Sequence, residues 1–66
     1  MKFNIGDLFI SGANGRGIIC GIEEYPTITE YIIYWTDGQP TSMGYTKFEI
    51  NAKVNRYDWH YYPVKK

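Results

Sequence analysis

One cysteine, Cys20, and one histidine, His60, are the feature that most constrains how this chain can fold. A single cysteine cannot form an intrachain disulfide, and one cysteine with one histidine cannot supply the four ligands of a structural zinc site. The chain has only 66 residues, and a domain of that size buries only about 60% of the surface that its unfolded chain exposes. Its core must therefore come from large side chains, and aromatic residues make up 18% of the sequence. We expect a single domain over residues 1–66, with no metal and no cofactor.

Seven Lys and Arg balance seven Asp and Glu. This zero net charge argues against strong, sequence-independent binding to duplex DNA, which depends on neutralising phosphates. The charges are unevenly distributed, because residues 1–30 have two cations and four anions, a net of −2, and residues 31–66 have five cations and three anions, a net of +2. Asp7 interrupts the N-terminal apolar run, and no run approaches the roughly 20 apolar residues that span a bilayer. We expect a cytoplasmic protein with no membrane partner.

Short alternating segments separated by glycine-rich turns predict a mainly β fold. Strands are expected at residues 6–10, 17–24 and 30–35, in a short segment after Pro40, and at residues 59–64. The Asp37-Gly38 step predicts a hairpin turn, and residues 11–17 predict a loop.

The alternation also predicts which side chains face the core. In residues 30–35, Tyr31, Ile33 and Trp35 share one face, and we expect Phe3 and Trp59 to pack with them, with Tyr61 beside Trp59 and with His60 and Tyr62 outside. In residues 17–24, the apolar side chains at every second position predict an inward face made of Ile18, Cys20 and Ile22.

Residues 46–56 fit two alternatives. Alternation of apolar and polar residues suits a strand, whereas Thr46 and Glu49 form a capping-box pattern at the start of a helix. Ile50 and Val54 are four apart and would share one helical face. We expect a short helix at residues 47–55.

The order “IGDLF”, a glycine-rich loop, “GIICGI”, “YIIYWTDG”, a short strand and a last strand resembles the small β-barrels of the Src-homology 3 (SH3) and Tudor type. The ending, “EIN” followed by “WHYYPV”, is similar to small proteins of tailed bacteriophages in which a helix precedes the final strand. The resemblance implies a small five-stranded SH3-like β-barrel with one short helix before the last strand, encoded by a phage and located in the host cytoplasm. Such barrels bind nucleic acids, peptides and nucleotides alike, so the resemblance does not select a function.

The segment “GANGRG”, residues 12–17, is the first candidate for ligand binding. Amides around glycines with positive φ can form an anion-binding nest, and an arginine can bind a phosphate through two parallel hydrogen bonds. The segment lacks the lysine of a P-loop and precedes a strand, so a plain barrel loop is the alternative. Exposed tyrosines can stack on a base. The expected ligand-binding residues come from this loop, the tyrosines and the C-terminal cations: Asn14, Gly15, Arg16, Tyr34, Tyr45, Lys53, Arg56, Tyr57 and Tyr62.

Two further expectations concern catalysis and assembly. His60 and Asp58 lie close in sequence, but no nucleophile with an orienting set accompanies them, so we expect no catalytic residues and no enzyme activity. Ile19, Ile32 and Tyr34 are expected on the outward faces of two adjacent strands, where a cluster of apolar side chains indicates an interface between copies of the chain.

The patterns predict a non-catalytic binding module that holds a small anionic nucleotide as a homo-oligomer, and the resemblance implies that such a module is a phage-type anti-defence protein that sequesters the nucleotide. A nucleic-acid-binding barrel and an inhibitor of a host protein remain as alternatives. Zero net charge favours the nucleotide and the host-protein hypotheses over the nucleic-acid hypothesis.

Overall fold

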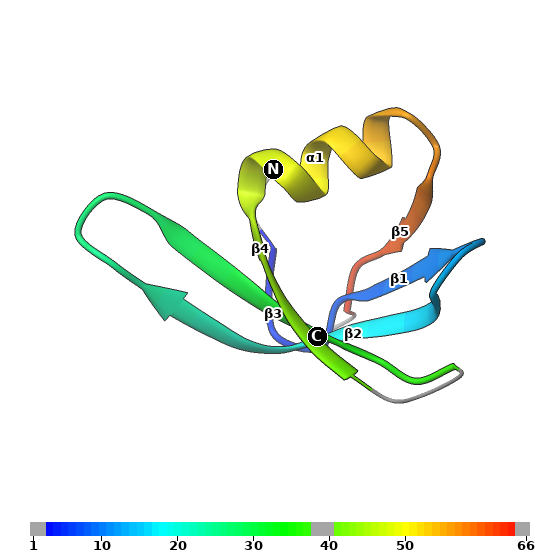
Figure 1. Ribbon diagram of the computed structural model, residues 1–66, viewed down its shortest axis with the longest axis horizontal. Coiled ribbons are helices and arrows are strands. Elements are labelled where there is room, and N and C mark those ends of the chain that lie inside the picture. The colour runs from blue at the N-terminus through cyan, green and yellow to red at the C-terminus, as the bar shows by residue number, and fades with distance from the viewer. Residues whose placement is uncertain (1–2, 38–40, 65–66) are drawn as a thin grey trace.

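The computed structural model describes residues 3–37 and 41–64. Gly38 and Pro40, which belong to the predicted turn and the start of the next strand, lie outside these residues. The described residues form five strands and one helix, in the order β1 (Leu8–Ser11), β2 (Gly15–Glu24), β3 (Thr29–Trp35), β4 (Thr41–Thr46), α1 (Lys47–Asn55) and β5 (Trp59–Tyr62). Figure 1 shows how these elements are arranged in space.

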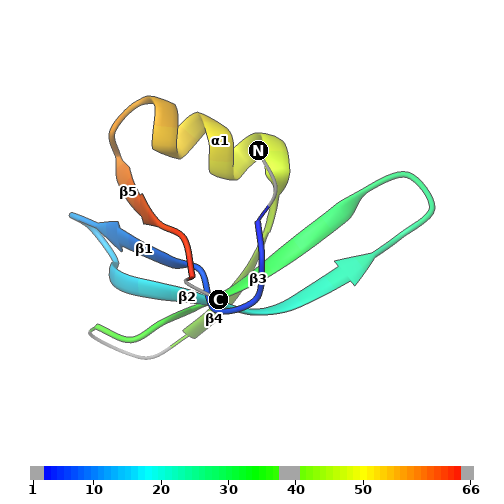
Figure 2. The same ribbon diagram turned by 180° about the vertical axis from the view of Figure 1, so that it is seen from behind.

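The strands form one antiparallel sheet in the order β4-β3-β2-β1-β5. The helix α1 lies over one face of this sheet and packs on β3, β4 and β5 (Figures 1 and 2). The prediction of five strands with one short helix before the last is therefore confirmed. β4 and β5 lie at the two edges of an open sheet, and α1 bridges the space between them.

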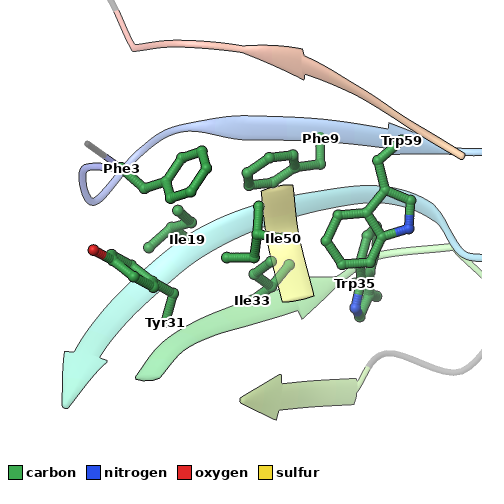
Figure 3. Packing of buried hydrophobic residues seen from close by; sticks show 8 residues of the cluster. All are labelled: Phe3, Phe9, Ile19, Tyr31, Ile33, Trp35, Ile50 and Trp59. Carbon is green, nitrogen blue, oxygen red and sulfur yellow. The ribbon is translucent and has the colours of Figure 1, made fainter. Parts of the chain in front are cut away.

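The face of the sheet beneath α1 carries the core, which we call the inner face. The alternation in β3 placed Tyr31, Ile33 and Trp35 on one side, and all three are buried. Rings pack edge to face across this core, as the Trp35 and Trp59 rings do with 5.0 Å between centroids. Figure 3 shows the whole buried cluster: Phe3, Phe9, Ile19, Tyr31, Ile33, Trp35, Ile50 and Trp59.

The predicted facing of β2 is wrong by one residue over residues 17–20. Ile19 is buried with only 1% of its surface exposed, whereas Ile18, Cys20 and Ile22 are exposed. The cause is Gly17, which lies opposite Trp35 in the ladder and leaves room for its ring. Because glycine has no side chain, the inward positions at 17 and 19 do not appear as an apolar alternation, and the prediction took Ile18 and Cys20 as inward instead. A register shift between Ile19 and Gly21 then places Ile22 opposite Tyr31, on the inner face, where 37% of its surface stays exposed.

The helix α1 confirms the interpretation of residues 46–56 as helical. The Thr46 hydroxyl accepts a hydrogen bond from the Glu49 amide, and the Glu49 carboxylate accepts one from the Thr46 amide, so both halves of the capping box form. Ile50 is buried in the core and Val54 packs against it. The apolar pair at spacing four therefore faces the sheet, as expected.

Asp7 is a buried carboxylate that joins the two ends of the chain. It lies just before β1 and is fully buried. Its carboxylate accepts hydrogen bonds from the Asn4 amide at 2.9 Å, the Tyr61 hydroxyl at 2.7 Å and the Val64 amide at 2.9 Å. Three donors compensate the cost of removing this group from water.

Candidate ligand-binding site

A groove lies between the β1–β2 turn and the segment that leads from α1 into β5. Its volume is about 440 Å³, within the roughly 300–1,000 Å³ typical of small-molecule sites. We call it the Tyr57 groove, and it is lined by Ser11, Gly12, Ala13, Asn14, Lys53, Tyr57, Asp58, Trp59 and His60.

The backbone at the end of α1 determines where Tyr57 points. The Tyr57 amide donates to the Val54 carbonyl at 3.1 Å, and the Asp58 amide donates to the Lys53 carbonyl at 3.0 Å. These two bonds form a Schellman motif, whose central residue takes a left-handed conformation. Tyr57 occupies that position with φ 62°, and it is the one non-glycine residue with positive φ in the described segments.

A tyrosine at this position is costly and contributes little to the fold. Glycine is the usual residue there, because a side chain in the left-handed region costs about 1–2 kcal/mol. The Tyr57 side chain is 81% exposed, so burial does not offset that cost. Strained backbone of this kind is found preferentially at ligand sites. The exposed ring instead stands at the edge of the groove.

The polar groups of the groove come from three elements. Lys53 lies in the last turn of α1, His60 on β5 and Asn14 in the β1–β2 turn. Asp58 adds a carboxylate, so the groove is lined by one lysine, one aspartate and one asparagine beside Tyr57. His60 borders the groove, but the ladder sets it opposite Ile10, which is opposite Arg16, so its side chain follows the outer face. This set can contact a planar ring and one anionic group at once.

The Ala13 and Asn14 amides are already used by hydrogen bonds within the turn, so they are not free to form the anion-binding nest predicted from the sequence. The Ala13 and Asn14 amides both donate to the Ser11 hydroxyl at 3.2 Å. Gly15 has φ 76°, and a Cβ built on it would collide with the Asp37 carboxylate. The turn is thus held by its own hydrogen bonds, and it contributes the Asn14 side chain to the groove rather than a row of free amides.

The structure divides the predicted ligand-binding residues among several places. Asn14, Lys53 and Tyr57 come together in the Tyr57 groove. Arg56 is the C-cap of α1 and is exposed, but it does not line the groove. Tyr45 is partly buried against the core, where its hydroxyl accepts a hydrogen bond from Trp35 Nε1 at 3.2 Å.

Arg16, Tyr34 and Tyr62 lie on the face of the sheet away from α1, the outer face. The ladder sets Tyr62 opposite Leu8, Leu8 opposite Ile18, and Ile18 opposite Tyr34, which gives a row of side chains on one face. Arg16 borders a shallow depression of about 330 Å³ beside this row. These residues therefore belong to a different surface from the Tyr57 groove.

The predicted interface of Ile19, Ile32 and Tyr34 needs the same correction as β2. Ile19 is buried in the core, so it cannot take part. Ile32 is partly buried and Tyr34 is 38% exposed, both on the outer face.

Sequence reasoning included residues 12 and 13 in the candidate loop but did not assign Ser11, Asp58, Trp59 or His60 to the ligand site. The signal that could have found them is the pairing of β1 with β5, which places Ser11 opposite Trp59 and so brings the turn next to Asp58. That pairing joins residues far apart in sequence, so no local pattern of residue types predicts it.

A scan against protein-family models, a search of curated proteins and a search of solved structures each found no match. Within residues 3–37 and 41–64, no helix has the length and apolar character needed to cross a membrane. The same residues contain no cluster of three or more histidine, cysteine or acidic side chains able to hold a metal ion.

Proposed function

We propose that this protein is a non-catalytic binding module of the SH3-like barrel type, and that the Tyr57 groove binds a small anionic nucleotide. The single observation that carries the proposal concerns Tyr57. Its backbone is left-handed, and its ring is exposed at the edge of a groove that Lys53 also lines. The strand order and the helix before β5 support the barrel assignment.

Each part of such a ligand has a partner in the groove. A base stacks on the Tyr57 ring, a contact worth about 1–3 kcal/mol. A phosphate pairs with the Lys53 ammonium, and a charge-assisted hydrogen bond of this kind contributes about 1.5–3 kcal/mol. The Asn14 side chain provides hydrogen-bonding groups for the base or the sugar.

The family resemblance supplies the biological setting of the proposal. A phage-encoded module that binds a nucleotide signal in the host cytoplasm would act as an anti-defence protein by sequestering that signal. Sequestration requires no chemistry, and a self-associating module would present several copies of the groove.

Calorimetric titration tests this proposal with a panel of cyclic dinucleotides, isomers of adenosine diphosphate ribose and a short DNA duplex, at two salt concentrations. We expect a nucleotide to bind the parent protein with a weak salt dependence, because few ionic contacts form. Tyr57→Gly and Lys53→Ala should each weaken binding. Tyr25→Ala and Arg16→Ala are matched controls, because these residues lie outside the groove, and they should leave the affinity unchanged.

Other outcomes of the titration select an alternative. Binding of the duplex alone, with a steep salt slope, would replace the nucleotide by nucleic acid as the ligand. If no member of the panel binds, the host-protein inhibitor becomes the leading hypothesis.

One observation favours this second candidate function. Phe48 on α1 is 82% exposed beside Ile28, which is 45% exposed, at a depression between α1 and the β2–β3 hairpin. Exposed apolar side chains in a cluster suit a protein partner.

A further inference from the structure

The free edge of β4 is built differently from the free edge of β5. β4 pairs only with β3 among the described strands, and its other contacts are with α1 and, through the Tyr45 and Trp59 rings, with the inner side of β5. The strand has the sequence TSMGYT, with no charged residue and no proline. Residues 41–44 are exposed. The nearest charge along the chain after the strand, Lys47, already belongs to α1.

The edge at β5 is shorter than the edge at β4. β5 has only four residues, and Pro63, which has no amide hydrogen, follows it directly. The next amide, that of Val64, donates to the Asp7 carboxylate at 2.9 Å. Natural sheets block edge-to-edge pairing with short strands, prolines and charges. β5 combines a strand of four residues with a proline directly after it, whereas β4 has six residues, no charge within the strand and one proline, Pro40, directly before it in the sequence.

We infer that β4 pairs antiparallel with β4 of a second copy of this chain, so that two sheets join into one across a two-fold axis. This inference deepens the self-association that forms part of the proposed function, and it does not depend on the ligand. We assign the partner strand to a second copy because β4 has no charged residue. When two β4 strands pair across a two-fold axis, no like charges face each other in any register.

The side chains on β4 fit this pairing. A two-fold axis normal to the sheet keeps each face continuous across the join, so Met43 and Tyr45 of both copies come to the same side. Within one chain these two side chains already touch, with the Tyr45 hydroxyl 3.5 Å from the Met43 sulfur. Met43 is 50% exposed, and pairing with a second copy would cover it. Contacts between methionine sulfur and aromatic rings are favourable.

The test combines sedimentation with amide hydrogen exchange over a range of protein concentrations. We expect the parent to dimerise, and the amides of residues 41–46 to exchange more slowly as the concentration rises. Met43→Lys should raise the dimer dissociation constant about tenfold or more, because it sets like charges close to the axis. Thr41→Lys, also exposed on β4, is a second variant with the same expected effect should Met43→Lys fail to fold.

Tyr34→Lys is the matched control, since it places the same charge on the outer face of the neighbouring strand, and it should leave the dimer intact. A dimer that resists Met43→Lys and Thr41→Lys but is broken by Tyr34→Lys would overturn the β4 pairing and move the interface to the outer face, with self-association retained. A parent that is monomeric at every concentration would overturn both the pairing and the self-association. Nucleotide binding in the Tyr57 groove is measured separately by calorimetry, so neither result decides it.

Discussion

The hydroxyl of Tyr61 on β5 donates a 2.7 Å hydrogen bond to the carboxylate of Asp7, 54 residues earlier in the chain. This bond and the one from the Val64 amide attach the last strand to the segment that precedes β1. Phe3, in the same early segment, packs edge to face on the Tyr61 ring with 5.3 Å between centroids. The two ends of the chain are therefore held by one buried polar centre and the rings around it.

Replacing Asp7 should destabilise the fold strongly. Asp7→Ala leaves three donors without an acceptor, two of them backbone amides, and each buried unsatisfied group costs about 1–3 kcal/mol. We expect a loss of about 3 kcal/mol or more in the free energy of unfolding, measured by urea denaturation. Asp58→Ala removes an exposed carboxylate and should change stability by no more than about 0.5 kcal/mol. Equal stabilities of the two variants would contradict a structural role for Asp7.

The Asp7–Tyr61 pair predicts a loss of stability at alkaline pH. Burial, the hydrogen bond to Asp7 and the charge of Asp7 raise the pKa of Tyr61 from 10.0 to about 12. Because the folded-state pKa lies above the unfolded value, the stabilisation is complete below pH 10 and is lost as the pH rises toward 12. Tyr61→Phe cannot ionise, so the stability difference between parent and variant should narrow over this range in urea titrations. A difference that stays constant from pH 9 to pH 12 would show that the hydroxyl ionises equally in both states.

Tyr57 should show opposite effects on stability and on binding. Tyr57→Gly removes a side chain from a left-handed position, and we expect it to be about 1 kcal/mol more stable than Tyr57→Ala, which keeps the strained backbone. Thermal or urea denaturation of the two variants measures this difference. Both variants lack the ring, so both should lose nucleotide affinity. If Tyr57→Gly is no more stable than Tyr57→Ala, the left-handed conformation is not imposed by the fold.

Gly17 and Gly12 form a matched pair of glycine substitutions. A Cβ on Gly17 would lie 2.6 Å from the Trp35 ring and 2.7 Å from Ile33, whereas a Cβ on Gly12 meets nothing within 4 Å. Gly17→Ala should therefore displace the buried ring and cost about 1–3 kcal/mol. Gly12→Ala should be neutral or slightly stabilising, because it restricts the unfolded chain. Similar melting temperatures for the two variants would show that Trp35 does not pack on Gly17.

The sequence alone determined the elements whose signals are local. The Thr46–Glu49 capping box predicts α1, because its two hydrogen bonds form within one turn of helix. The alternation of Tyr31, Ile33 and Trp35 predicts the buried face of β3, since large side chains mark every inward position of that strand. A short chain with one cysteine also required a core of aromatic rings, and the buried cluster contains them.

Three features were decided by the tertiary structure alone. They are which side chains of β2 point inward, the burial of the Asp7 carboxylate, and which residues line the Tyr57 groove. Gly17 faces inward because the Trp35 ring from the next strand needs its empty space, and glycine leaves no apolar mark in the sequence. Asp7 is buried because Tyr61 and Val64 arrive from the far end of the chain to donate to it. Asn14, Lys53 and Tyr57 meet because β1 pairs with β5, while the same sheet carries Arg16 to the outer face. Each outcome depends on contacts between residues distant in sequence, and a local pattern of residue types contains no record of them.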